Sequence, residues 1–245
     1  MRFMLNVIQA ERLKWRRTFI PKLTWLAPAV ALLLCAVLMG GSLFQSGSYN
    51  WWYTLFLPGA LSLACSLALL KDAKLKYRSL LALPFTPGTL WTSKILACTG
   101  WLLTTLAVFL TGVTAGSLLF GQMITLPSSL AGSALIFLTF LWQIPLCLFL
   151  AARLGLFAAI LLNLFGTILG VVQFDKGGLW DYIPYTITAR LMCPVLSILP
   201  NGLPVPADSP LRSTDMILPG TLVSLGWFAL LFLLTTLWFR RQEAK

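Results

Sequence analysis

The sequence contains no histidine, and only seven of its 245 residues are acidic. The absence of histidine excludes catalytic and zinc sites that depend on an imidazole group. The five cysteines form no Cys-x-x-Cys pair, and four lie inside apolar runs, so we interpret them as small packing residues. Nor does the sequence contain the GxxxxGKS/T pattern of a phosphate-binding loop, so it predicts no ATP-hydrolysing site in this chain.

Charged side chains are also scarce. They make up 10% of the chain, which is too few to cover the surface of a soluble protein of this size. Hydrophobic residues account for 58%, and the mean hydropathy is +0.87. This composition predicts an all-α polytopic membrane protein, with residues 1–245 forming a single transmembrane domain.

Six apolar segments are long enough to cross a bilayer, which takes about 20 residues in a helix. They cover residues 23–44, 51–70, 92–119, 129–152, 155–173 and 217–239. The fourth and fifth form one nearly continuous apolar run that would overshoot the bilayer as a single helix. We therefore predict a hairpin that turns at Arg153.

The basic residues are distributed unequally over the predicted loops. If the N-terminus is cytoplasmic, 15 of the 18 cations and three of the seven acids fall on that side, a net charge of +12. The outer segments then carry a net charge of −1. This asymmetry follows the positive-inside rule, so we predict that both termini are cytoplasmic. It also explains the excess positive charge without a nucleic-acid partner.

Two further segments are expected to be helical without crossing the membrane. Within residues 1–20, apolar side chains from Met1 to Phe19 fall near one face, which is typical of an interfacial helix on anionic headgroups. Within the outer segment 174–216, the apolar stretch Leu191–Leu199 is short and contains Pro194. We interpret it as a re-entrant or surface element.

The six predicted spans contain no acidic residue, so they provide no ionisable relay for proton or sodium coupling. They also lack the nucleophile–base and metal-ligand sets of intramembrane enzymes, which makes an enzyme the least favoured class. Gln143 and Asn163 could contact a passing substrate, but such amides more often hydrogen-bond a neighbouring helix. Two GxxxG pairs, Gly112/Gly116 and Gly166/Gly170, predict close helix packing.

The segment 71–91 lies on the cytoplasmic side between the second and third spans. A helix is predicted from Asp72 to Leu83, because Pro84 disfavours helical geometry in the residue before it. Thr86 and Pro87 predict the cap and first residue of the next helix. This segment is either a coupling helix that transmits force from a cytoplasmic partner or a basic loop resting on lipid headgroups.

In this arrangement the chain resembles the type-2 ABC exporter permeases, and more narrowly the permeases of lantibiotic-immunity ABC transporters. Four stretches carry the resemblance: ERLKWRRTFIPKL at 11–23, KLKYRSLLALPFTPGTLWTSKI at 74–95, YIPYTITARLMCPVLSILPNGLPVP at 182–206, and FRRQ at 239–242.

The resemblance implies a permease of the bacterial cell membrane that expels or displaces lantibiotics or other amphipathic antimicrobial peptides. It implies no cofactor on this chain, with Mg-ATP bound by a separate cytoplasmic ABC ATPase in two copies. A second permease, related or identical, would complete the path through the bilayer. The alternatives are a permease for a lipid or another drug, and a non-transporting scaffold or sensor subunit.

Two sets of site residues follow from this interpretation. The expected contacts with the ATPase are Leu75, Tyr77, Arg78, Leu80, Leu81 and Leu83. The expected substrate path includes Gln143, Asn163, Leu191, Val195 and Leu199.

Overall fold

The computed structural model describes residues 2–74 and 85–241. These residues contain no β-strand, and one isolated bridge joins Ile198 to Pro204, which confirms the all-α class. Their α-helices are α1 (Arg2–Trp15), α2 (Ile20–Leu38), α3 (Phe44–Trp51), α4 (Leu57–Lys74), α6 (Pro87–Phe120), α7 (Leu126–Phe140), α8 (Gln143–Leu154), α9 (Leu156–Val172), α10 (Pro184–Leu196) and α11 (Ile217–Arg240). The π-helical turn η2 (Trp52–Phe56) links α3 to α4, and three short 3₁₀ turns are η1 (Gly41–Leu43), η3 (Gly178–Tyr182) and η4 (Pro210–Arg212).

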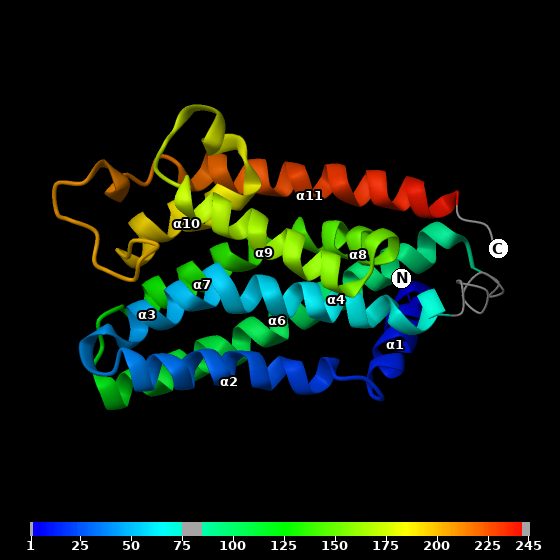
Figure 1. The fold of residues 1–245 in the computed structure, drawn as a ribbon, viewed down its shortest axis with the longest axis horizontal. Helices are drawn as coiled ribbons and strands as arrows, with labels where there is room; N and C mark the ends of the chain where they lie inside the picture. The colour runs from blue at the N-terminus through cyan, green and yellow to red at the C-terminus, as the bar shows by residue number, and fades with distance from the viewer. Residues whose placement is uncertain (1, 75–84, 242–245) are drawn as a thin grey trace.

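The long helices run side by side along the long axis of the molecule, with α2 and α11 at opposite edges of the bundle (Figure 1). The helix α1 lies across one end, together with the end of α4, the start of α6 and the end of α11 (Figure 1). The connections 39–43, 121–125 and 197–216 lie at the other end (Figure 1). The bundle therefore has two distinct ends, and we call the end that carries α1 the α1 end.

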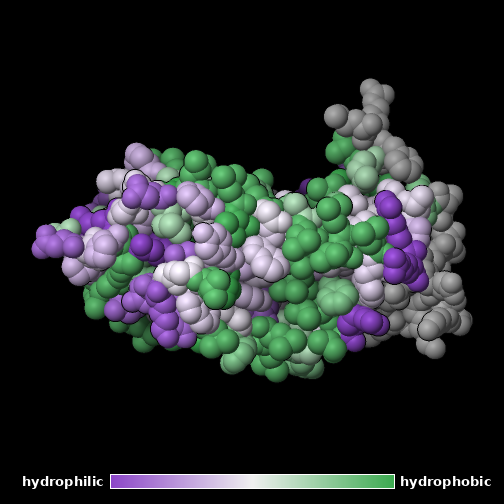
Figure 2. All heavy atoms as spheres, turned by 90° about the horizontal axis from the view of Figure 1, so that it is seen from above, coloured by the Kyte–Doolittle hydropathy of each residue, from purple (hydrophilic) through white to green (hydrophobic). Residues whose placement is uncertain are grey.

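Four helical stretches of the described chain are long and apolar enough to cross a membrane: α2, residues 41–70, α6 and α11. The bent pair α7–α8 is a fifth if its two helices form one span, and α9 is an apolar helix of 17 residues. In Figure 2, hydrophilic residues gather towards the two ends of the molecule, and hydrophobic surface predominates between them. The described helices therefore support a polytopic membrane protein.

Two predicted helix boundaries are confirmed. The side chain of Thr86 accepts a hydrogen bond from the Thr89 amide at 3.3 Å, and Pro87 is the first residue of α6. The hairpin also turns beside Arg153, because α8 ends at Leu154 and Gly155 adopts a φ of +90°. A left-handed φ of this kind is accessible to glycine at little steric cost, so the chain can reverse within one residue.

The fourth predicted span, residues 129–152, is not one straight helix. It is divided into α7 and α8, whose axes differ by 41°. The bend lies just before Pro145, which has no amide hydrogen to donate to the carbonyl oxygen of Leu141. That oxygen instead accepts from the Ile144 amide at 3.1 Å. Pro145 therefore bends this span, although it lies inside a continuous apolar run.

Two other predicted helices need correction. Asp72 does not begin a separate helix, because α4 continues without interruption to Lys74, and the rest of the predicted helix, residues 75–83, lies outside the described residues. In the outer segment, α10 begins at Pro184 and ends at Leu196, so it starts earlier than the predicted stretch 191–199. A proline at the first helical position needs no amide partner, which makes residue 184 a favourable start.

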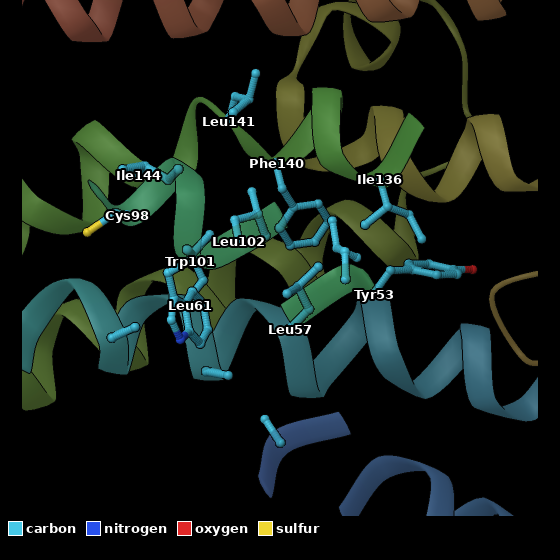
Figure 3. Packing of buried hydrophobic residues seen from close by; sticks show 14 of the residues in the cluster. Tyr53, Leu57, Leu61, Cys98, Trp101, Leu102, Ile136, Phe140, Leu141 and Ile144 are labelled. Atoms are coloured by element: carbon cyan, nitrogen blue, oxygen red, sulfur yellow. The ribbon is translucent and has the colours of Figure 1, made fainter. Parts of the chain in front are cut away.

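The core joins η2 and α4 to α6 and to the α7–α8 pair, as Figure 3 shows. The side chains labelled there are Tyr53, Leu57, Leu61, Cys98, Trp101, Leu102, Ile136, Phe140, Leu141 and Ile144. The predicted role of the GxxxG pairs in packing is confirmed. A Cβ at Gly116 would collide with the Phe44 ring, and a Cβ at Gly166 would collide with the Tyr185 ring.

Candidate functional site

The six residues predicted to contact an ATPase lie outside the described residues. They are Leu75, Tyr77, Arg78, Leu80, Leu81 and Leu83, within the segment 75–84. The structure does describe α4, which precedes this segment, and α6, which follows it. The residues at those two positions form the first candidate site.

Lys94 lies in the third turn of α6 and is fully buried. Its Nζ donates a hydrogen bond to Glu11 Oε2 at 2.8 Å, and it also donates to Asp72 Oδ2. The second oxygen of Glu11 accepts from Lys14 Nζ at 2.7 Å, and Lys14 lies 3.6 Å from Asp72 Oδ1. We call these four residues the ion network.

The ion network joins three helices at the α1 end of the bundle. Glu11 comes from α1, Asp72 from the last turn of α4, and Lys94 from α6. Glu11 is 2% exposed and Asp72 is 5% exposed, so these two carboxylates and the Lys94 ammonium have almost no contact with solvent. Asp72 lies near the end of α4, before the segment 75–84, and Lys94 lies near the start of α6, after it. The network therefore holds the end of α4 against the start of α6.

The network also determines which face of α1 is buried. The residues that face α6 are Val7, Glu11 and Trp15, at helical spacing. Of the apolar face predicted for residues 1–20, Trp15 is buried, whereas Leu5 and Phe19 are exposed, and the contact of this face with headgroups stays a prediction. The orientation of α1 places the Glu11 carboxylate against Lys94, where it compensates the buried charge.

Energetically, the network is a balanced set of charges. Two carboxylates face two ammonium groups, and the buried ammonium donates to both acids. Such a set contributes little net stability compared with an apolar replacement, but the loss of one partner leaves an uncompensated buried charge. The arrangement can therefore hold three helices in one relative position, and it is sensitive to the removal of any one member.

A second buried polar cluster lies at the middle of the bundle. Asn163 Nδ2 is 2.9 Å from Gln143 Oε1, 2.9 Å from Ser62 Oγ and 3.2 Å from the Pro58 carbonyl oxygen. Tyr185 completes it by donating its hydroxyl hydrogen to Asn163 Oδ1 at 3.0 Å. The interpretation that the two amides bond neighbouring helices is confirmed, since the cluster connects α4, α8, α9 and α10.

This cluster occupies the place where two helical stretches are irregular. Gln143 is the first residue of α8, directly after the bend, and Pro58 follows η2. The Pro58 carbonyl accepts from Ser62 Oγ at 2.7 Å as well as from Asn163. The cluster therefore holds the first turns of α4 and α8 against α9.

The outer residues of the predicted substrate path occupy different environments. Leu191 is buried and packs between α10 and α11, close to Gly220. Val195 and Leu199 are half-buried. Of these three, Leu191 is part of the packed interior, and the other two retain surface that an amphiphile could touch.

The structure places no three metal-ligating side chains together among residues 2–74 and 85–241. All five cysteines are buried and free.

Comparison of the chain with protein-family models, with curated proteins and with solved structures found no match.

Proposed function

We propose that this chain is the membrane subunit of an ATP-driven ABC exporter that expels or displaces lantibiotics or other amphipathic antimicrobial peptides. In this proposal it crosses the bacterial cell membrane six times, with α9 as the fifth span and both termini in the cytoplasm. The proposal rests on the resemblance to type-2 ABC exporter permeases. The structural observation that supports it best is the ion network, which ties α4 and α6 together on either side of the predicted coupling segment.

The proposed mechanism uses this connection to transmit force. A separate cytoplasmic ABC ATPase, present in two copies with Mg-ATP, docks on residues 75–83 and moves that segment during its cycle. Because Asp72 and Lys94 are bonded to each other and to Glu11, such a movement displaces α4, α6 and α1 together. The shift reaches the second and third spans without being absorbed in a flexible joint.

A second permease, identical or related, completes the proposed path. Amphipathic peptide approaches from the outer leaflet, where Val195 and Leu199 keep part of their surface accessible. In the proposed role the buried cluster around Asn163 is a structural element beside the path, because its polar atoms already bond one another.

Replacement of Leu80 and Leu81 by Asp tests the coupling segment. If these leucines anchor the ATPase, buried carboxylates should cost roughly 2 kcal/mol or more per anchor and abolish co-purification of the ATPase. Membrane abundance should stay normal, because the spans and flanking cations are unchanged. The readouts are ATPase recovery, peptide-stimulated ATP hydrolysis and peptide resistance in cells.

The matched control replaces Lys74 and Lys76 by Gln in the same segment. Surface charges are individually worth about 0–1 kcal/mol, so this variant should retain its ATPase. A loop that rests on headgroups predicts the reverse ranking, with the lysines more important than the leucines. Normal ATPase binding and resistance in the double-Asp variant would favour a scaffold or sensor subunit. Stimulation by lipids or other drugs instead of peptides would favour the alternative substrates.

A further inference from the structure

A groove opens between α1, α2 and α6 at the α1 end, close to the ion network but separate from it. Its volume is about 620 Å³. The residues that line it include Arg12, Arg16, Trp15, Thr24, Trp25 and Trp101. The groove therefore combines two cations with an aromatic wall.

The charge of the groove is positive and uncompensated. Arg12, in the last turn of α1, and Arg16, directly after it, are exposed and form no ion pair within the described residues. No acidic side chain lines the groove. The nearest acid in sequence, Glu11, is committed to Lys14 and Lys94 on the buried side of α1. The two guanidinium groups are thus available for an external anion.

Trp15 and Trp101 form an aromatic wall of the groove. The indole nitrogens of Trp15 and Trp101 form no hydrogen bond, although these side chains are only 6% and 4% exposed. The two nitrogens are enclosed by protein, as are the equally unpartnered indoles of Trp52 and Trp142 in the core, so this wall offers ring surface to a ligand. Figure 3 shows that Trp101 otherwise sits among the apolar side chains of the core.

The groove continues onto apolar surface along α2. Trp25 is 66% exposed at its rim, and Leu33 further along the same helix is equally exposed. A free phosphate would use the arginines but not this surface. A phospholipid would use both, because its headgroup is anionic and its acyl chains are apolar.

We propose that the groove binds one anionic phospholipid, with the phosphate between Arg12 and Arg16 and an acyl chain along α2 past Trp25. Charge-assisted hydrogen bonds from arginine are strong and geometrically specific for phosphate. Tryptophan is enriched at the level of lipid headgroups, where its apolar ring and polar N–H are both accommodated. The site rests on α1 lying at the membrane surface and does not depend on the substrate of the protein.

The test measures lipid retention by native mass spectrometry on the purified full chain in neutral detergent. Phosphatidylglycerol should be retained in preference to phosphatidylcholine, and an excess of inorganic phosphate should not displace it. Replacement of Arg12 and Arg16 by Gln should weaken retention about tenfold or more, which corresponds to ~1.4 kcal/mol or more. The matched control replaces the exposed residues Arg17 and Lys22 by Gln, which removes the same charge outside the groove and should leave retention unchanged.

Three results would overturn the proposal. Equal retention of phosphatidylcholine would show that the phosphate site does not select an anionic lipid. An equal loss in the control would show general attraction to the surface. Displacement by inorganic phosphate would show a site for small anions. A second variant guards against misfolding: Thr24→Trp narrows the groove and keeps both arginines, so it should weaken lipid retention while the melting temperature without lipid stays the same.

Discussion

Lys94 is enclosed on all sides, and its carboxylate partners come from two other helices. Its position near the start of a span could be predicted, because the apolar run begins there. Its partners could not be predicted, since Asp72 is 22 residues away and Glu11 is 83 residues away. Such pairs are brought together by the packing of helices, and a single sequence carries no information on that. Tyr185 and Ser62 were missed for the same reason.

Replacement of Lys94 by Met should strongly destabilise the protein. The variant leaves Glu11 and Asp72 close together without the central cation, and breaking a buried pair costs about 3–5 kcal/mol. Thermal unfolding in detergent, followed by size-exclusion chromatography, measures the effect. The control Lys22→Met removes an exposed lysine and should unfold like the parent protein.

A combined variant separates charge from packing at the same site. Lys94→Met together with Glu11→Gln and Asp72→Asn removes all three buried charges and should recover much of the lost stability. If Lys94→Met alone unfolds at the temperature of the parent protein, the ion network does not hold the helices.

Among the helices, the features that depend on neighbouring residues could be predicted from the sequence, and those that depend on tertiary packing could not. Long apolar runs predicted the membrane helices, Thr86 predicted a cap and the break at Arg153 predicted a turn, because these signals lie in neighbouring residues. The bend between α7 and α8 was missed because a proline inside an apolar run can be accommodated in more than one way. The start of α10 could have been found from Pro184, which follows a turn and is typical of a first helical position.

The approach of α9 to α10 depends on glycine. A Cβ at Gly170 would meet the backbone carbonyl group of Tyr185, so Gly170→Ala must push the helices apart and disturb the bond from Tyr185 to Asn163. We expect a loss of roughly 1–3 kcal/mol in stability, measured by thermal unfolding. The control is Gly226→Ala in α11, where the added methyl group meets open space. It should be neutral or slightly stabilising, because alanine favours helix. Equal melting of both variants would contradict the proposed role of this contact.

At the scale of the whole molecule, the two ends of the bundle differ in charge and shape. The α1 end carries the basic helix α1, the end of α4 and the start of α6, and the other end carries segment 197–216 (Figure 1). The sequence could predict this division because charge is counted along the chain. It could not predict how α1 and α10 pack against the ends of the long helices, since that depends on contacts between distant residues.

Cysteine labelling tests which end faces the cytoplasm. Ala207→Cys and Arg17→Cys place exposed thiols at opposite ends of the bundle. With cytoplasmic termini, an impermeant maleimide should label residue 207 in intact cells and residue 17 only after permeabilisation. The parent protein is the background control, because its five cysteines are buried. Labelling of residue 17 in intact cells would reverse the predicted orientation.

The ion network has a further consequence for energetics. Its two acids and two lysines sum to zero net charge, so a joint displacement of α1, α4 and α6 carries no net charge from this site across the bilayer. A membrane potential does work of about 2.3 kcal/mol per 100 mV only on a net charge that moves through it. The electric field across the bilayer therefore does no net work on these four residues when they are displaced together, at whatever depth they lie.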